Sequence, residues 1–131
     1  MSERKIFCYR LNEDKLKWYK DAAAYLGFKI IRLSDDDLNI RISELIKNKN
    51  ENFDSNKYSP TNELAEEIIL FADFPSEMLS EILSAYKASG LEKTSLKAVL
   101  TETNINWTFK ELYNDISDEH AYMQKIKEQN K

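Results

Sequence analysis

Short apolar runs alternate with amphipathic stretches along the first half of the chain. Residues 6–11 (IFCYRL) and 28–33 (FKIIRL) are rich in branched and aromatic side chains, and they predict two strands. Between them, apolar side chains recur at helical spacing over residues 12–26, and Gly27 follows where a left-handed helix cap is expected. Residues 38–46 carry a shorter helical pattern. The first half therefore predicts the order strand, helix, strand, helix.

The same order recurs after a polar interruption. Residues 47–62 (KNKNENFDSNKYSPTN) break the pattern and predict a mobile connection. Residues 68–72 then predict a third strand, 75–90 a helix that ends at a glycine, and 96–100 a fourth strand. A long amphipathic helix follows, and we expect it to fray from Lys125 onward.

The two halves of the sequence resemble each other. Residues 6–27 align with 69–90 at an offset of 63, and after a four-residue insertion 33–45 align with 100–112 at an offset of 67. These two alignments cover 35 positions and contain eight identities, where about two are expected by chance. We interpret the pattern as an internal repeat of two βαβα units.

The repeat predicts one α/β domain over residues 1–131, with units at 5–46 and 67–124 joined by the polar connection 47–62. Neither unit can bury both faces of its strand pair alone, so we expect the two tandem βαβα units to form one four-stranded sheet with helices packed on it. Alternation of strands and helices favours mainly parallel strands. The alternative is a ferredoxin-like α+β arrangement, in which the strands of the two units interleave.

Composition and charge exclude several classes of protein. No apolar run approaches the ~20 residues of a membrane span, and the N-terminus does not resemble a signal sequence, so we expect a cytoplasmic protein with no membrane contact. The net charge of -4 argues against nucleic-acid binding. The net charge is +3 over residues 1–50 and -7 over residues 51–131. The lone Cys8 is predicted to be a buried hydrophobic residue.

The last third of the chain carries a distinctive motif. It is T-E-T-N-x-x-W-T at residues 101–108, followed about a dozen residues later by the pair Glu119-His120. With this motif, residues 68–123 resemble a bacterial domain-of-unknown-function family, number 3783. The resemblance implies a small bacterial cytoplasmic protein and no particular activity.

Acidic and hydroxylic side chains follow the second and fourth predicted strands. Asp35, Asp36, Glu102 and Asn104 lie just past the carboxyl ends of strands, where open α/β sheets usually bind ligands. Their oxygens could hold Mg²⁺ with a phosphate compound opposite. The structural alternative is helix capping, because Ser, Thr, Asp and Asn before a helix accept hydrogen bonds from its free N–H groups. Capping is the favoured interpretation.

Two tryptophans are candidates for partner binding. Trp107 lies at the start of the last helix, and Trp18 lies between core-facing positions of the first helix, near Tyr25. Exposed aromatic side chains there would bind a protein partner or a second copy in a homodimer, whereas the structural alternative is core packing. His120, the single histidine, falls on the apolar stripe of the last helix and is predicted to be packed.

Catalytic chemistry has little support in the sequence. The dinucleotide, P-loop and C-x-x-C signatures are absent, so we assign no catalytic residue, no metal site and no cofactor. We therefore expect a non-enzymatic interaction or regulatory module. The alternative is a small-ligand binding protein or Mg-dependent enzyme acting on a phosphate compound at the carboxyl ends of the strands.

Overall fold

The structure, a computed structural model, describes residues 4–48, 63–64 and 66–129. Four strands form one sheet in the order β2-β1-β3-β4, which confirms the predicted α/β fold. The strands are β1 (Lys5–Tyr9), β2 (Lys29–Leu33), β3 (Ile68–Ala72) and β4 (Leu96–Val99). Every side chain of β1 and β3 is buried, because these two strands lie at the centre of the sheet and are covered on both faces.

The sheet is mixed, whereas the sequence favoured mainly parallel strands. β1 is parallel to β2 and β3 is parallel to β4, but the two central strands β1 and β3 are antiparallel. The reason is that each half forms its own parallel pair through a crossover helix, and the halves then join through their first strands. The strands do not interleave, so the ferredoxin-like alternative is wrong.

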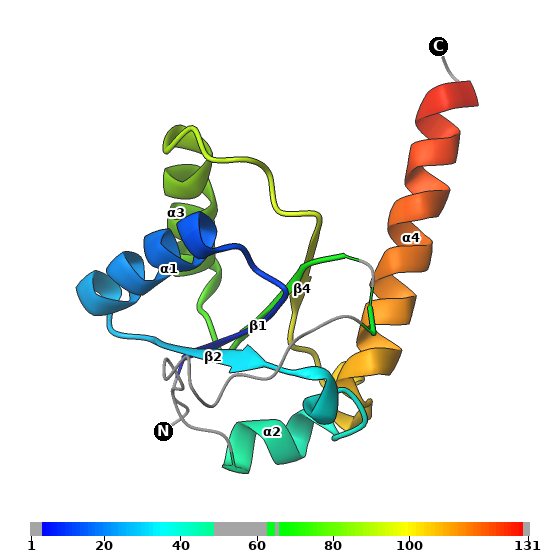
Figure 1. Cartoon of the computed structure of the whole chain (residues 1–131). Coiled ribbons are helices and arrows are strands. Elements are labelled where there is room, and N and C mark those ends of the chain that lie inside the picture. Colours follow the sequence, from blue (N-terminus) through cyan, green and yellow to red (C-terminus); the bar gives the residue numbers. More distant parts are fainter. Residues whose placement is uncertain (1–3, 49–62, 65, 130–131) are drawn as a thin grey trace.

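Helices cover both faces of the sheet (Figure 1). Side chains of α1 and α3 enter the core on one face, and side chains of α2 and α4 enter the core on the other. The helices are α1 (Glu13–Leu26), α2 (Ile42–Asn48), α3 (Ser76–Ala88) and α4 (Phe109–Gln129), with short 3-10 turns η1 (Asp35–Asp37) and η2 (Asn104–Asn106). No helix in the described residues is long and apolar enough to cross a membrane.

Local signals set several helix ends. The Asn12 side chain accepts a hydrogen bond from the Lys15 N–H at the start of α1, and Gly27 ends that helix with φ of 80°. The last helix differs from the prediction, because it continues to Gln129 and does not fray from Lys125. The predicted connection 47–62 lies outside the described residues, apart from the two residues at the end of α2.

The chain segments that precede α2 and α4 pair with each other on the face that these helices cover. The Ile42 N–H donates to the Trp107 carbonyl at 2.8 Å, and the Phe109 N–H donates to the Ile40 carbonyl at 3.3 Å. An isolated antiparallel bridge between Arg41 and Thr108 lies between these two bonds. The two halves of the chain are therefore joined at two places, by the pairing of β1 with β3 in the sheet and by the pairing of these segments on the face covered by α2 and α4.

Candidate functional site

The loop after β2 is held by its own acidic side chains. The Asp37 carboxylate accepts hydrogen bonds from the Ser34 N–H at 2.9 Å and from the Ser34 hydroxyl at 3.3 Å; the first of these is one half of the capping box of η1, and in the other half the Ser34 side chain accepts from the Asp37 N–H. The Asp35 carboxylate accepts from the Tyr9 hydroxyl at 2.5 Å and from the Glu63 N–H at 3.3 Å. Asp36 is exposed. Asp37, which the sequence did not single out, is the most buried acid of this loop.

Tyr9 connects this loop to the segment that leads into β3. Its side chain is fully buried, and its hydroxyl oxygen accepts a hydrogen bond from the Leu64 N–H at 3.2 Å while donating to Asp35. Burial, followed by the bond to the Asp35 carboxylate, raises the pKa of Tyr9 to about 12. The Asp35 carboxylate therefore has a structural role that joins three parts of the chain.

The loop after β4 uses Asn104 in the same way. The Asn104 side-chain oxygen accepts from the Thr101 N–H at 2.8 Å, and its amide nitrogen donates to the Val99 carbonyl at 3.0 Å. Asn104 is buried at 7% exposure, so these bonds satisfy a side chain that has little access to solvent. Glu102 is exposed and lines a surface hollow together with Asp73.

The sheet topology separates the acidic residues directly after β2 and β4, although the later parts of the two loops pair with each other at residues 40–42 and 107–109. β2 and β4 are the two edge strands, and they run in opposite directions because β1 and β3 are antiparallel. The carboxyl ends of β2 and β4 therefore lie at opposite corners of the sheet, with Asp35 and Asp36 beyond one corner and Glu102 beyond the other. Within the described residues, no group of three or more His, Cys, Asp or Glu side chains could hold a metal ion. Ligand binding by either loop stays a prediction.

Both tryptophans are half-buried and contribute to packing. The Trp18 ring makes edge contacts with Tyr19 and with Tyr86 of α3, at centroid distances of 5.0 and 5.1 Å. Trp107 packs against the core cluster under α2 and α4. Their role in partner binding stays a prediction, because part of each side chain remains accessible.

An exposed apolar surface occurs instead on α4, where the sequence analysis did not place it. Tyr122 is 64% exposed and Met123 is 49% exposed, on consecutive residues of one helix. His120 is exposed too, so its predicted packing is wrong. Figure 1 shows the reason: the C-terminal half of α4 stands apart from the sheet and from the other helices. The sequence did carry a signal for this: the apolar pattern of the last helix is longer than that of the other helices. A helix that is longer than the sheet it packs on must extend beyond the sheet.

Comparisons with known proteins identify the second half of the chain. No curated protein and no solved structure matches the sequence. Residues 67–123, from the residue before β3 to Met123 in α4, match the family described as Domain of unknown function (DUF3783). This match is to the same family that the motif at residues 101–120 resembles.

Proposed function

We propose that the protein is a non-enzymatic interaction module that associates with a second copy of itself through the outer part of α4. The observation that carries this proposal is the exposure of a well-formed helix. Asp118 to Met123 and Lys125 are all exposed, whereas Leu112 and Tyr113, about two turns earlier, are buried. We call residues 118–125 the projecting segment. A helical segment of this length without tertiary packing is marginal in water, so contact with a partner would stabilise it.

The charge pattern of the projecting segment favours a second copy as the partner. Glu119 and Lys125 are each three residues from Tyr122, on opposite sides of it along the helix. When two such helices cross antiparallel at Tyr122, Glu119 of each copy lies opposite Lys125 of the other. The contact is then self-complementary, which is the requirement for a symmetric dimer.

The apolar surface of the projecting segment determines how strongly two copies are expected to associate. Burying one Tyr or Met side chain contributes about 1.5–3 kcal/mol, so two copies with two such side chains each gain roughly 6–12 kcal/mol. Loss of translational and rotational freedom costs about 4–15 kcal/mol. The balance supports a weak, reversible dimer with a dissociation constant in the range of tens of micromolar or above.

Sedimentation equilibrium between roughly 10 µM and 1 mM protein tests the proposal. We expect reversible association of the unchanged chain and its loss in the double variant Tyr122→Ser with Met123→Ser. Tyr25→Ser is the matched variant, because Tyr25 is 89% exposed on α1; we expect it to associate normally, and loss of association in this variant instead would place the contact on α1 and contradict the proposal. A monomer at every concentration, or equal association of the double variant, would contradict the proposal.

A further inference from the structure

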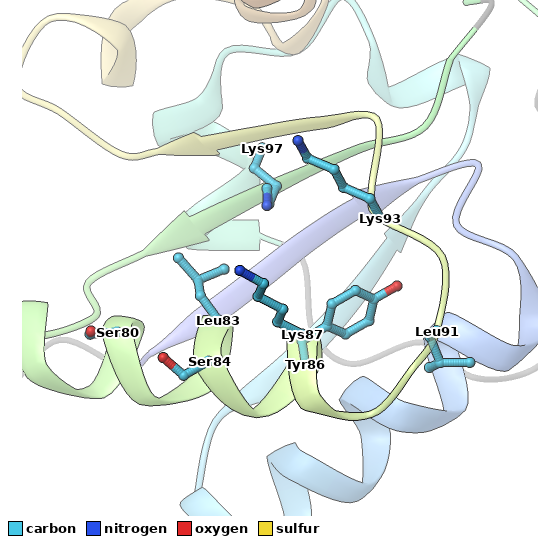
Figure 2. Close-up of a pocket in the computed structure, with 8 residues that line it drawn as sticks. All are labelled: Ser80, Leu83, Ser84, Tyr86, Lys87, Leu91, Lys93 and Lys97. Carbon is cyan, nitrogen blue, oxygen red and sulfur yellow. The ribbon is translucent and has the colours of Figure 1, made fainter.

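Three lysine side chains converge on one cavity between α3 and β4. Lys87 comes from α3, Lys93 from the connection after it, and Lys97 from β4. Figure 2 shows the ends of Lys87 and Lys97 directed toward each other across the cavity, while Lys93 extends toward β4, with its nitrogen beside the backbone end of Lys97. These three residues are separated by six and four positions in the sequence, so only the fold brings them together.

The cavity has the size and lining of a small-molecule site. Its volume is about 520 Å³, within the ~300–1,000 Å³ typical of ligand pockets. Leu83, Leu91 and the ring of Tyr86 supply apolar surface, and Ser80 and Ser84 supply hydroxyl groups along α3. The lining therefore combines positive charge, neutral donors and an apolar wall.

Within the described residues, no carboxylate pairs with the positive charge of this cavity. Residues 51–131 contain eight Lys and Arg against 15 Asp and Glu, yet three of the eight lie here. In the part of the chain that the structure describes, no ion pair with a carboxylate engages Lys87, Lys93 or Lys97. Burial lowers the pKa of Lys97, and the neighbouring charge of Lys93 lowers it further. An anion in the cavity would relieve this repulsion.

The backbone that presents Lys93 is fixed on both sides. The Tyr86 hydroxyl donates to the Glu92 carbonyl at 2.5 Å, and the Ser95 N–H donates to the Glu67 carboxylate at 3.2 Å. The buried ammonium group of Lys15 forms an ion pair with Glu67 and also donates to the Lys93 carbonyl at 3.3 Å. Little ordering of this connection is therefore needed when a ligand binds.

We propose that this cavity binds a small organic phosphate, with the phosphate held by Lys87, Lys93 and Lys97 and the organic part packed on Leu83 and Leu91. A phosphate fits between the facing ammonium groups of Lys87 and Lys97, with the charge of Lys93 nearby, because it carries up to two negative charges and several acceptor oxygens. The apolar wall favours an organic ester over the inorganic ion. The acids Glu77 and Glu81 line the adjacent hollow with Ser80 and Ser84, and they limit how far an anion extends along α3.

Titration calorimetry tests this site with four probes: AMP, phenyl phosphate, inorganic phosphate and adenosine. We expect AMP or phenyl phosphate to bind saturably and at least about tenfold more tightly than inorganic phosphate, because the apolar wall contributes. Adenosine should bind most weakly, because it lacks the charge. The affinity for the organic phosphate should fall as salt concentration rises.

Lysine variants test whether the organic phosphate binds in this cavity. Lys97→Gln and Lys87→Gln should each weaken binding of the organic phosphate by about tenfold or more, whereas Lys17→Gln on the exposed side of α1 removes the same charge and should leave it unchanged. All three positions are exposed, so the variants should fold. The proposal is overturned if neither organic phosphate binds, if the lysine variants bind as well as the unchanged chain, or if a hexaglutamate peptide binds more tightly than both phosphates.

Discussion

Phe7 and Leu70 lie directly opposite each other where β1 and β3 pair, and the offset of 63 that aligns the two halves maps one onto the other. A residue that pairs with its own equivalent marks the position of a two-fold axis. Arg41 and Thr108 form a second pair of this kind, at the offset of 67. The register of the structure therefore supports the predicted repeat.

Backbone conformation repeats at the same offset. Among the described residues, positive φ occurs at Arg10 (59°) and Asp73 (64°), and at Gly27 (80°) and Gly90 (81°). Each pair is separated by 63 positions. The turns after β1 and β3 therefore adopt left-handed backbone conformations at equivalent positions. The same holds for the turns that end α1 and α3.

Alanine at either glycine should destabilise the protein by a similar amount. An added Cβ at Gly27 would come no closer than 3.8 Å to Arg4, and at Gly90 it would meet nothing within 4 Å, so the cost arises from the backbone. We expect Gly27→Ala and Gly90→Ala to lower the free energy of unfolding by about 1 kcal/mol each. Urea denaturation measures this. Gly27→Asn should cost less, since Asn tolerates this conformation better, and an Asn variant less stable than the Ala variant would contradict the argument.

Tyr9 and Asp35 should behave as a coupled pair. Tyr9→Phe leaves the buried Leu64 N–H without its acceptor, so we expect a loss of about 1–3 kcal/mol in unfolding free energy. Asp35→Ala should cost a similar amount, and the double variant should cost less than the sum, with a coupling of about 0.5–3 kcal/mol. Asp36→Ala, at an exposed position, should stay within about 0.5 kcal/mol of the unchanged protein. Strict additivity would show that the two side chains act independently.

Variants of Asn104 and Glu102 distinguish a structural role from ligand binding in the loop after β4. Asn104→Ala removes two hydrogen bonds from a buried position and should lower the unfolding free energy by about 1–3 kcal/mol. Glu102→Ala changes an exposed side chain and should be nearly neutral. Thermal denaturation of both variants measures the difference. A stabilising effect of Glu102→Ala would instead indicate that this carboxylate is held under strain, as expected of a ligand site.

The protein should lose stability in alkali because buried thiol and phenol groups hold their protons in the folded state; besides Cys8 and Tyr9 these include Tyr19, whose pKa burial also raises. Burial raises the pKa of Cys8 from 9.0 to about 12, and burial with the Asp35 bond raises that of Tyr9 from 10.0 to about 12. Both groups keep their protons in the folded state while the unfolded chain loses them, so stability is retained below pH 9 and falls as pH rises from 9 toward 12. Each fully linked group contributes about 1.4 kcal/mol per pH unit.

Urea denaturation at pH 7, 9 and 10 checks this dependence. Cys8→Ala should have a shallower decline between pH 9 and pH 10 than the unchanged chain. As an independent readout, the Cys8 thiol should resist alkylation at pH 8 in the folded protein and react fully in urea, because it is buried and protonated. Rapid labelling of the folded protein would contradict the assignment.

Sequence patterns predicted the elements and the single four-stranded sheet, but not the direction in which the two strand pairs meet. The run at Ile68–Ala72 matches β3 residue for residue, because a fully buried strand is a continuous apolar run. The antiparallel contact of β1 with β3 has no local signal, since it depends on how two complete units meet. His120 shows the same limit: helical spacing placed it on the packed stripe of the last helix, but its side chain is exposed.

Prediction of the candidate sites depends even more strongly on how the two halves of the chain are arranged. Asp35 and Glu102 follow strands in the same way, and a parallel sheet would have brought them to one edge, whereas the observed sheet separates them. The three lysines of the α3–β4 cavity lack any shared periodicity in the sequence. Their grouping depends on the crossover that places α3 beside β4, and no motif in the chain encodes it.

Charge exchange on the projecting segment tests the central claim most directly. In an antiparallel dimer, Glu119→Lys alone places two pairs of lysines opposite each other, and Lys125→Glu alone places two pairs of glutamates opposite each other. Sedimentation equilibrium should therefore show weaker association for each single variant, and recovery for the double variant. An equimolar mixture of the two single variants should associate at least as strongly as the unchanged chain, because every pair is then attractive. Association that is the same in all five samples, or that the mixture fails to restore, would contradict self-association through α4.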